Sequence, residues 1–237
     1  MSRALQVITD SAILLMTKSS WTDMQPYQTA FFNLALEKGI LKFGSFTLKS
    51  GRVSPYFFNA GGFNDGESLR TLGECYAAAI VDSGLAFDML FGPAYKGIPL
   101  AASIAIALSA RHQRNVPYAY NRKEAKTHGE GGLLVGAVLE GRVLITDDVI
   151  SAGTSVRESA KWITEASATL GGVAIALDRQ ERGKGPESAA QEVARTFGIE
   201  VIAIAGLSDL IKYLEHNQTG DVDIEAIRSY RERYGSQ

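Results

Sequence analysis

The chain has 237 residues, 46% of them hydrophobic and 21% charged, with a formal net charge of −2 at pH 7. This balance is typical of a globular protein with one large domain, and it excludes the overall basic charge of a general nucleic-acid or membrane-surface binder. The apolar runs are too short to span a bilayer, and the single cysteine, Cys75, excludes an intramolecular disulfide. We therefore expect a cytoplasmic protein with no membrane or nucleic-acid partner, in which Cys75 is a small buried hydrophobe.

Residues 1–23 show no hydrophobic periodicity, and we expect an extension there, followed by a single domain over residues 24–237. The segment 26–38 predicts an amphipathic helix that ends at a glycine. Residues 44–59 carry β-branched and aromatic side chains on both sides of Ser50-Gly51-Arg52, a pattern that favours a β-hairpin. Helix and hairpin together predict a small N-terminal hood.

Strands and helices alternate through the rest of the domain. The patterns predict strands at 87–91, 117–120, 143–145, 173–177 and 201–205, and helices at 69–81, 100–111, 154–163, 207–216 and 224–234, with another helix that ends near 197. This alternation favours βαβ units, and hence an α/β fold whose parallel sheet has helices on both faces. Ligands bind beyond the carboxyl ends of such strands, so the segments 92–96, 147–155 and 178–179 are candidate site segments.

The most informative segment is 143–155. A short β-branched strand is followed by the adjacent carboxylates Asp147 and Asp148, and then by small residues over 151–155 that open a helix. Backbone N–H groups in such a turn, together with the positive end of the helix, suit a phosphate monoester. Since a phosphate and two carboxylates would repel one another, we expect the carboxylates to hold ribose hydroxyls or a hydrated Mg²⁺. The plain alternative is an ordinary helix-capping turn.

Residues 121–132 form a polar, glycine-rich segment with no hydrophobic period, and we expect a loop. It contains the cations Arg122, Lys123 and Lys126 and the histidine His128. A solvated charged loop is one interpretation. The other is that these cations neutralise a strongly negative group of a bound ligand when the loop closes, while closure keeps water from the reacting centre.

The Asp-Asp turn resembles the phosphoribosyl-pyrophosphate (PRPP) signature of the type I phosphoribosyltransferases. Three further segments, 46–59, 91–99 and 122–131, narrow the resemblance to the orotate phosphoribosyltransferase family. The similarity runs from about Met24 to the C-terminus, and residues 24–28 resemble the start of shorter family members. We therefore expect either that translation begins at Met24 or that the preceding residues are a dispensable or poorly ordered extension.

The resemblance implies a role for each matching residue. PRPP-binding positions are Lys49, Tyr95, Lys96, Arg122, Lys123, Lys126, His128, Asp147, Asp148, Val149, Ile150, Ser151, Ala152, Gly153, Thr154 and Ser155. Of these, Lys49, Lys126 and Asp148 are implied to be catalytic. Orotate-binding positions are Phe57, Phe58, Ser151 and Arg179. Two plainer readings stay open: the Phe pair is core, and Arg179 forms a salt bridge with Glu181.

The resemblance also implies the reaction. A pentosyltransferase of this kind transfers the 5-phosphoribosyl group of PRPP to orotate, giving orotidine 5′-monophosphate and pyrophosphate in pyrimidine (UMP) biosynthesis. It implies Mg²⁺ bound mainly through PRPP, near Asp147 and Asp148, rather than by a protein ligand set. It further implies a homodimer in which the loop 121–132 completes the neighbouring site, so that Lys126 acts in trans.

Two other functions remain open. The first is transfer to a different base, because the Asp-Asp signature also serves purines and uracil; the hairpin and the 122–132 loop argue against it. The second is a non-catalytic regulator that senses PRPP and binds nucleic acid. Such a regulator needs a DNA-binding segment or a basic face, and the sequence has neither.

Overall fold

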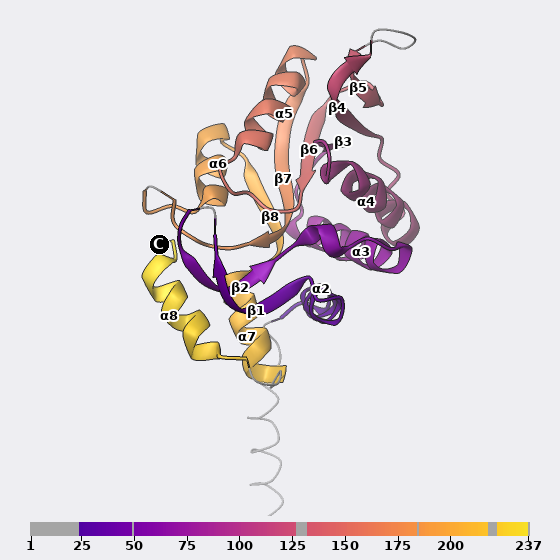
Figure 1. The fold of residues 1–237 in the computed structure, drawn as a ribbon. Coiled ribbons are helices and arrows are strands. Elements are labelled where there is room, and N and C mark those ends of the chain that lie inside the picture. Colours follow the sequence, from indigo (N-terminus) through magenta and orange to yellow (C-terminus); the bar gives the residue numbers. More distant parts are fainter. Residues whose placement is uncertain (1–23, 49, 127–131, 184, 218–221, 237) are drawn as a thin grey trace, which may run out of the picture.

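Figure 1 shows the computed structural model of the protein, which describes residues 24–48, 50–126, 132–183, 185–217 and 222–236. The predicted extension 1–23, Lys49 and His128 lie outside the described residues, and so does the side chain of Lys126. Within those described ranges, no helix is both long enough and apolar enough to cross a membrane.

A six-stranded sheet in the order β5–β4–β3–β6–β7–β8 forms the centre of the molecule. Its strands are β3 (Met89–Gly92), β4 (Tyr118–Lys126), β5 (Gly132–Gly136), β6 (Arg142–Asp147), β7 (Thr169–Asp178) and β8 (Glu200–Gly206). Neighbours from β4 through to β8 in this order run parallel, which confirms the predicted α/β fold. The exception is β5, which runs antiparallel to β4.

The β4–β5 hairpin differs from the prediction, which places a loop over residues 121–132. The strand β4 continues to Lys126, and Asn121 pairs with Leu134 of β5. An edge hairpin of this kind is held by backbone pairing and needs no alternating apolar pattern, so polar residues hide it from a periodicity search. At its end Gly136 has φ +103°, and an added Cβ would lie 2.5 Å from the Tyr118 carbonyl oxygen, so the position requires glycine.

Helices cover both faces of the sheet, as predicted (Figure 1). On one face lie α2 (Pro26–Glu37), α3 (Gly66–Ser83), α4 (Gly97–His112) and α7 (Leu207–Asn217), and on the other α5 (Thr154–Glu165) and α6 (Ala189–Phe197). The helix α3 begins with a capping box, in which the Ser68 amide donates to Asp65 Oδ1 at 2.7 Å, and ends at Gly84 in the left-handed conformation.

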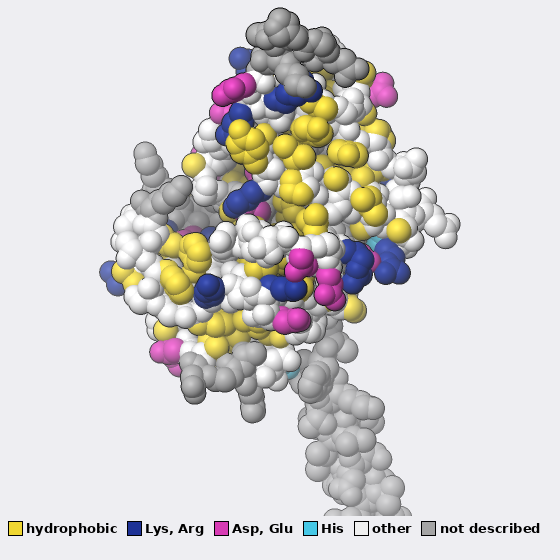
Figure 2. Space-filling view, turned by 45° about the vertical axis from the view of Figure 1, so that its right-hand side comes forward, with side chains coloured by type: hydrophobic (Ala, Val, Ile, Leu, Met, Phe, Trp, Pro, Cys, Tyr) yellow, Lys and Arg dark blue, Asp and Glu magenta, His cyan; other side chains and the backbone are white. Residues whose placement is uncertain are grey.

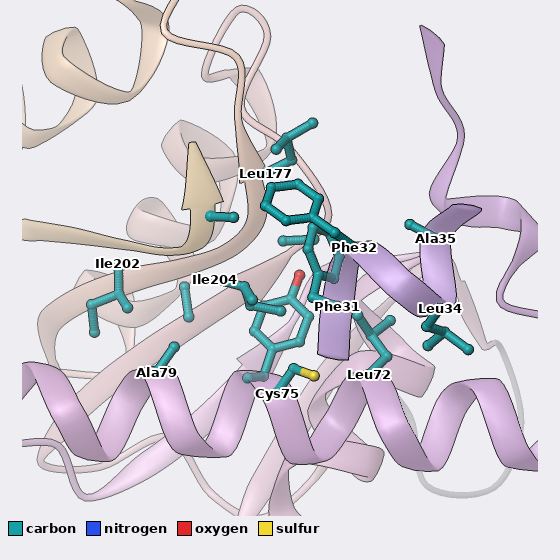
Figure 3. Packing of buried hydrophobic residues seen from close by; sticks show 14 of the residues in the cluster. Phe31, Phe32, Leu34, Ala35, Leu72, Cys75, Ala79, Leu177, Ile202 and Ile204 are labelled. Atoms are coloured by element: carbon teal, nitrogen blue, oxygen red, sulfur yellow. The ribbon is translucent and has the colours of Figure 1, made fainter. Parts of the chain in front are cut away.

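The larger hydrophobic core joins the hood to the sheet. Figure 3 shows Phe31 and Phe32 of α2 near Leu72 and Cys75 of α3, with Leu177 of β7 on the far side. Cys75 is 3% exposed, which confirms that it is a small buried hydrophobe. Because α2 packs directly on α3, the hood is continuous with the main domain.

The hood itself contains the predicted hairpin. Its strands β1 (Leu41–Thr47) and β2 (Val53–Phe58) pair antiparallel, with an irregular register between Phe43 and Phe46. A short 3₁₀ turn (Ala60–Gly62) follows, and the C-terminal helix α8 (Ile224–Tyr234) packs against β2. The C-terminal helix therefore forms part of the hood, although it is far from the hairpin in sequence.

Candidate active site

The Asp-Asp turn has the predicted strand–turn–helix geometry. The strand β6 ends at Asp147, and α5 begins at Thr154 after Gly153, which has φ 66° in the left-handed region. Lys96 and residues 147–156 line a cavity of about 350 Å³ at this point. Since the cavity contains the amino end of α5 and small side chains, it suits a phosphate group.

The two carboxylates of the turn are fixed by different partners. Lys96 Nζ lies 2.6 Å from Asp148 Oδ2, and the Asp148 amide donates to Asp147 Oδ1 at 2.9 Å. The Tyr76 hydroxyl of α3 donates to the Asp147 carbonyl oxygen at 2.7 Å. Lys96 therefore supplies the positive charge beside the pair, whereas Asp147 accepts hydrogen bonds at both its carboxylate and its carbonyl oxygen.

Asp147 has an unusual protonation equilibrium. Burial raises the pKa of its carboxyl to about 6, and the Asp148 charge adds to this rise, although the Asp148 amide opposes it. A carboxyl with this pKa is mostly ionised at neutral pH, but its charge is poorly solvated and therefore energetically unfavourable. It gains from any hydroxyl or cation that approaches it.

The segment 92–97 crosses close to the start of α4. An added Cβ on Gly92 would lie 2.1 Å from the Gly97 carbonyl oxygen, so the crossing requires glycine. The Ala94 amide donates to the buried Asn121 side chain at 2.8 Å, and the peptide between Ala94 and Tyr95 is cis. Tyr95 is 70% exposed, and Lys123 Nζ lies 5.6 Å from the centre of its ring.

A second cavity, of about 470 Å³, lies between β4 and the turn at the start of α5. Its lining includes Arg122 and Lys123 of β4, Ala94 of the 92–97 segment, and Thr154 and Ser155 of α5. The structure thus brings together most of the described residues predicted to bind PRPP. The exception among the described residues is Tyr95, which lines neither cavity. Lys49, His128 and the side chain of Lys126 lie outside the described residues. The PRPP-binding roles of all these residues remain predictions.

The predicted orotate-binding residues lie in different surroundings. Ser151 lines the phosphate-turn cavity, but Phe57, Phe58 and Arg179 line neither cavity described above. Phe57 is 38% exposed and stacks on Phe46, whereas Phe58 packs on the core. The guanidinium of Arg179 binds Glu181, the salt bridge left open as the plainer interpretation.

Two residues of the site were not found from the sequence. Asn121 holds the amide of Ala94, and Tyr76 holds the carbonyl of Asp147. Asn121 directly precedes Arg122 in the basic segment, and this position could have marked it as a site residue. No sequence signal marks Tyr76, because an aromatic residue in a helix is normally core.

This chain is similar in sequence and fold to known proteins. A family model described as "Phosphoribosyl transferase domain" matches residues 65–205. A protein of Yersinia pestis (strain Pestoides F) named orotate phosphoribosyltransferase is 59% identical over 212 residues, covering 90% of this chain and 99% of the relative. The crystal structure of an orotate phosphoribosyltransferase from Francisella tularensis has a TM-score of 0.78 and 42% identity, covering 87% of this chain and 99% of that chain. One from Aeropyrum pernix has a TM-score of 0.59 and 26% identity, covering 79% and 98%.

Proposed function

Because this chain belongs to the orotate phosphoribosyltransferases, we propose that the cavity beside Asp147 and Asp148 is its PRPP site. The reaction transfers the 5-phosphoribosyl group of PRPP to orotate and yields orotidine 5′-monophosphate and pyrophosphate, a step of pyrimidine biosynthesis. The observation that carries the proposal is the geometry of this cavity, where the amino end of α5 faces two fixed carboxylates.

The donor is bound at both ends. Backbone groups of 149–155 surround the 5′-phosphate, and the positive end of α5 stabilises its charge. Asp147 and Asp148 accept hydrogen bonds from the ribose hydroxyls. This division of roles follows from charge, because the phosphate and the carboxylates occupy the same cavity and must avoid each other.

Charge stabilisation and positioning drive the displacement. The pyrimidine N1 attacks ribose C1 as the bond from C1 to the pyrophosphate oxygen breaks, so no covalent enzyme intermediate is needed. Lys96, Arg122 and Lys123 lie around the two joined cavities, where the pyrophosphate charge develops. Lys49 and Lys126 are assigned to the same reacting centre, and His128 to the pyrophosphate.

The residues around Asp147 suit Mg²⁺. No cluster of three or more His, Cys, Asp or Glu side chains that could hold a metal exists in the described part of the chain. Mg²⁺ is commonly bound through one or two carboxylates and substrate phosphates, so Asp147 and Asp148 would hold it together with PRPP. When bound, it would neutralise pyrophosphate charge. The raised pKa of Asp147, caused by burial, fits a carboxylate that gains from such a cation.

Orotate is assigned to the region between the hood and the sheet. Phe57 offers an exposed ring for stacking, Ser151 a hydroxyl, and Arg179 a cation for the orotate carboxylate. Phe58 contributes through its position next to Phe57, since its own ring packs on the core.

A homodimer is the proposed assembly, with residues 121–132 completing the neighbouring site. Hydrophobic side chains gather on the face formed by α4, β4 and β5 (Figure 2). Of nine exposed large hydrophobics among the described residues, four lie on or next to these elements: Ile106, Tyr118, Leu134 and Val138. Leu133 of β5 instead lines the cavity beside α5. An apolar face of this kind favours a partner. We also assign the cytoplasm as the compartment of the protein.

The test is pyrophosphate release with PRPP and Mg²⁺, offering orotate, uracil, hypoxanthine and adenine separately. We expect turnover with orotate alone. Turnover with another base would overturn the acceptor site while keeping the donor site. Bound PRPP with no turnover on any base would point instead to a regulator.

A further inference from the structure

The guanidinium of Arg179 is held on two of its three nitrogens. Its Nε and Nη2 both donate to Oε1 of Glu181, at 2.9 and 2.5 Å, and Nη2 also donates to the Ser54 hydroxyl at 3.3 Å. Its plane lies over the Tyr56 ring, with Cζ 4.5 Å from the ring centre. The hydrogen bonds of Arg179 with described residues all start from Nε and Nη2, although the buried Tyr230 hydroxyl also interacts with the guanidinium.

The residues that hold Arg179 are themselves buried. Ser54 and Tyr56 are both 0% exposed, and the Ser54 hydroxyl donates to the Tyr56 carbonyl oxygen at 2.7 Å. The Tyr56 hydroxyl donates to the same oxygen of Glu181, at 3.4 Å. One carboxylate oxygen therefore receives hydrogen bonds from both Arg179 and Tyr56, in surroundings where water competes little.

The C-terminal segment keeps Glu181 in place. Arg182 N donates to the Tyr234 carbonyl oxygen at 2.9 Å, and Ser236 N donates to the Gln180 carbonyl oxygen at 2.8 Å. These two hydrogen bonds flank Glu181, which also forms a backbone bridge with Gly235. The loop after β7 is thus fixed to the end of α8, so Glu181 has little freedom to follow a moving Arg179.

These contacts leave one edge of the guanidinium open. An arginine has five N–H donors in a rigid planar fork, and here Nε and Nη2 are occupied by Glu181 and Ser54. We propose that Glu181 and Tyr56 are positioning residues for the acceptor base, which hold Arg179 so that its Nη1 edge donates to orotate. The inference rests on the proposed role of Arg179 in orotate binding.

The opposite role is also chemically possible, because Glu181 and the orotate carboxylate are both anions. If Glu181 competed with orotate for Arg179, removing its charge would tighten orotate binding. If Glu181 positions Arg179, removing its charge lets the guanidinium turn and weakens orotate binding. The two roles thus predict changes of opposite sign in the same constant.

Steady-state kinetics of Glu181→Gln separate these roles. We expect the KM for orotate to rise roughly tenfold, with kcat and the KM for PRPP within about twofold of the original. The matched control is Glu187→Gln, since Glu187 also pairs with an arginine, Arg195 at 2.9 Å, but more exposed to solvent. The control should leave all three constants within about twofold.

A double-mutant cycle with Arg179→Ala identifies which assumption fails. If Arg179→Ala leaves the KM for orotate unchanged, the proposed acceptor role of Arg179 is wrong. If Arg179→Ala raises it but Glu181→Gln does not, only the positioning role is wrong. We expect Glu181→Gln to have no further effect when Arg179 is already alanine. A lower KM for orotate in Glu181→Gln would overturn the inference in favour of competition.

A second variant covers the case in which Glu181→Gln does not fold. Tyr56→Phe keeps the ring under Arg179 and removes only the hydroxyl that donates to Glu181. We expect about a threefold rise in the KM for orotate, with the KM for PRPP unchanged. A folded Tyr56→Phe protein with an unchanged KM for orotate would overturn the role of Tyr56.

Discussion

The ionised form of Asp147 is the form proposed to bind the ribose, yet the same buried charge destabilises the fold. Its carboxyl is buried next to Asp148, and burial raises its pKa from 3.8 to about 6. A raised carboxyl pKa means that the folded state binds the proton more tightly than the unfolded chain. Ionisation of Asp147 therefore lowers the free energy of unfolding as the pH rises from about 4 to about 6, and the whole loss is present above pH 6.

Asp147→Asn should raise the stability of the ligand-free protein above about pH 6, because asparagine carries no buried charge. We expect Tm to rise by roughly 2–5 °C near neutral pH, and the gain to shrink as the pH is lowered toward 4. Activity should fall by about 100-fold, because a weaker acceptor replaces the carboxylate at the ribose. Thermal unfolding at several pH values and initial rates check both parts.

The matched control for that experiment is Asp88→Asn. Hydrogen bonds from Arg142 lower the pKa of Asp88 to about 2, so its ionised form stabilises the fold above its unfolded pKa. The control should therefore lose stability at neutral pH, opposite in sign to Asp147→Asn. A lower Tm for Asp147→Asn near neutral pH would contradict the claim that the buried charge of Asp147 destabilises the fold.

Single residues also mark how far the sequence could predict the site. The pair Asp147 and Asp148 and the small residues after it have a local pattern, and the structure places them around one cavity. Phe57 and Phe58 were assigned the same role, but neighbouring residues of a strand point to opposite faces, so only Phe57 is exposed. The salt bridge between Arg179 and Glu181 joins residues only two apart and was one of the two interpretations open from the sequence. The contacts of Arg179 with Ser54 and Tyr56 depend on packing between distant segments, which no local pattern specifies.

At the level of elements, the crossing of β3 and α4 depends on Gly92. An alanine Cβ there would lie 2.1 Å from the Gly97 carbonyl oxygen and 2.9 Å from Ala101 Cβ. Gly92→Ala should lower the free energy of unfolding by about 3 kcal/mol, since backbone must move to make room. Urea denaturation checks this value. The Gly92→Ala substitution should also weaken PRPP binding, because the crossing positions the segment that carries Tyr95 and Lys96.

Gly66→Ala is the control for this prediction. Gly66 is the first residue of α3, and nothing lies within 4 Å of an added Cβ. It should change the free energy of unfolding by less than about 0.5 kcal/mol. Equal losses in the two variants would mean that close approach is not what requires glycine at position 92.

Elements with a hydrophobic period were predictable, and the one without it was not. The parallel strands are buried on both faces, so each appears in the sequence as a short apolar run. The edge strand β5 and the outer half of β4 are held by backbone pairing with few buried side chains, and the sequence therefore suggested a loop. The same hairpin carries Arg122 and Lys123. The sequence therefore revealed the positive charge of this segment but not its strand structure.

For the whole molecule, the exposed apolar face over α4, β4 and β5 predicts self-association. Ile106 is 69% exposed within it, and Ile106→Glu should dissociate the proposed dimer because a buried unpaired carboxylate is costly at an interface. Sedimentation velocity should show a folded monomer, and initial rates should show little activity. Val53→Glu, at an apolar residue of the hood that is 55% exposed, should remain dimeric. A dimer that survives Ile106→Glu would place the interface elsewhere.

Completion of one site by the other subunit can be tested by mixing two inactive proteins. Lys126→Ala should lower kcat by at least about 100-fold, and so should a variant with both Asp147→Asn and Asp148→Asn. If Lys126 acts in trans, hybrid dimers contain one intact site, and equal mixing should restore about a quarter of full activity. No recovery after proven subunit exchange would show that Lys126 acts within its own subunit.

Tyr76 makes the interior of this protein part of its active site. Its ring is 1% exposed within the larger core, yet its hydroxyl holds the carbonyl of Asp147 at 2.7 Å. Repacking that core to obtain a more heat-resistant enzyme should shift this hydroxyl, and with it Asp147, the carboxylate proposed to bind the ribose. Libraries of core variants should therefore keep Tyr76 fixed and be selected for turnover as well as for melting temperature. The reason is that one side chain both fills the core and fixes the position of Asp147.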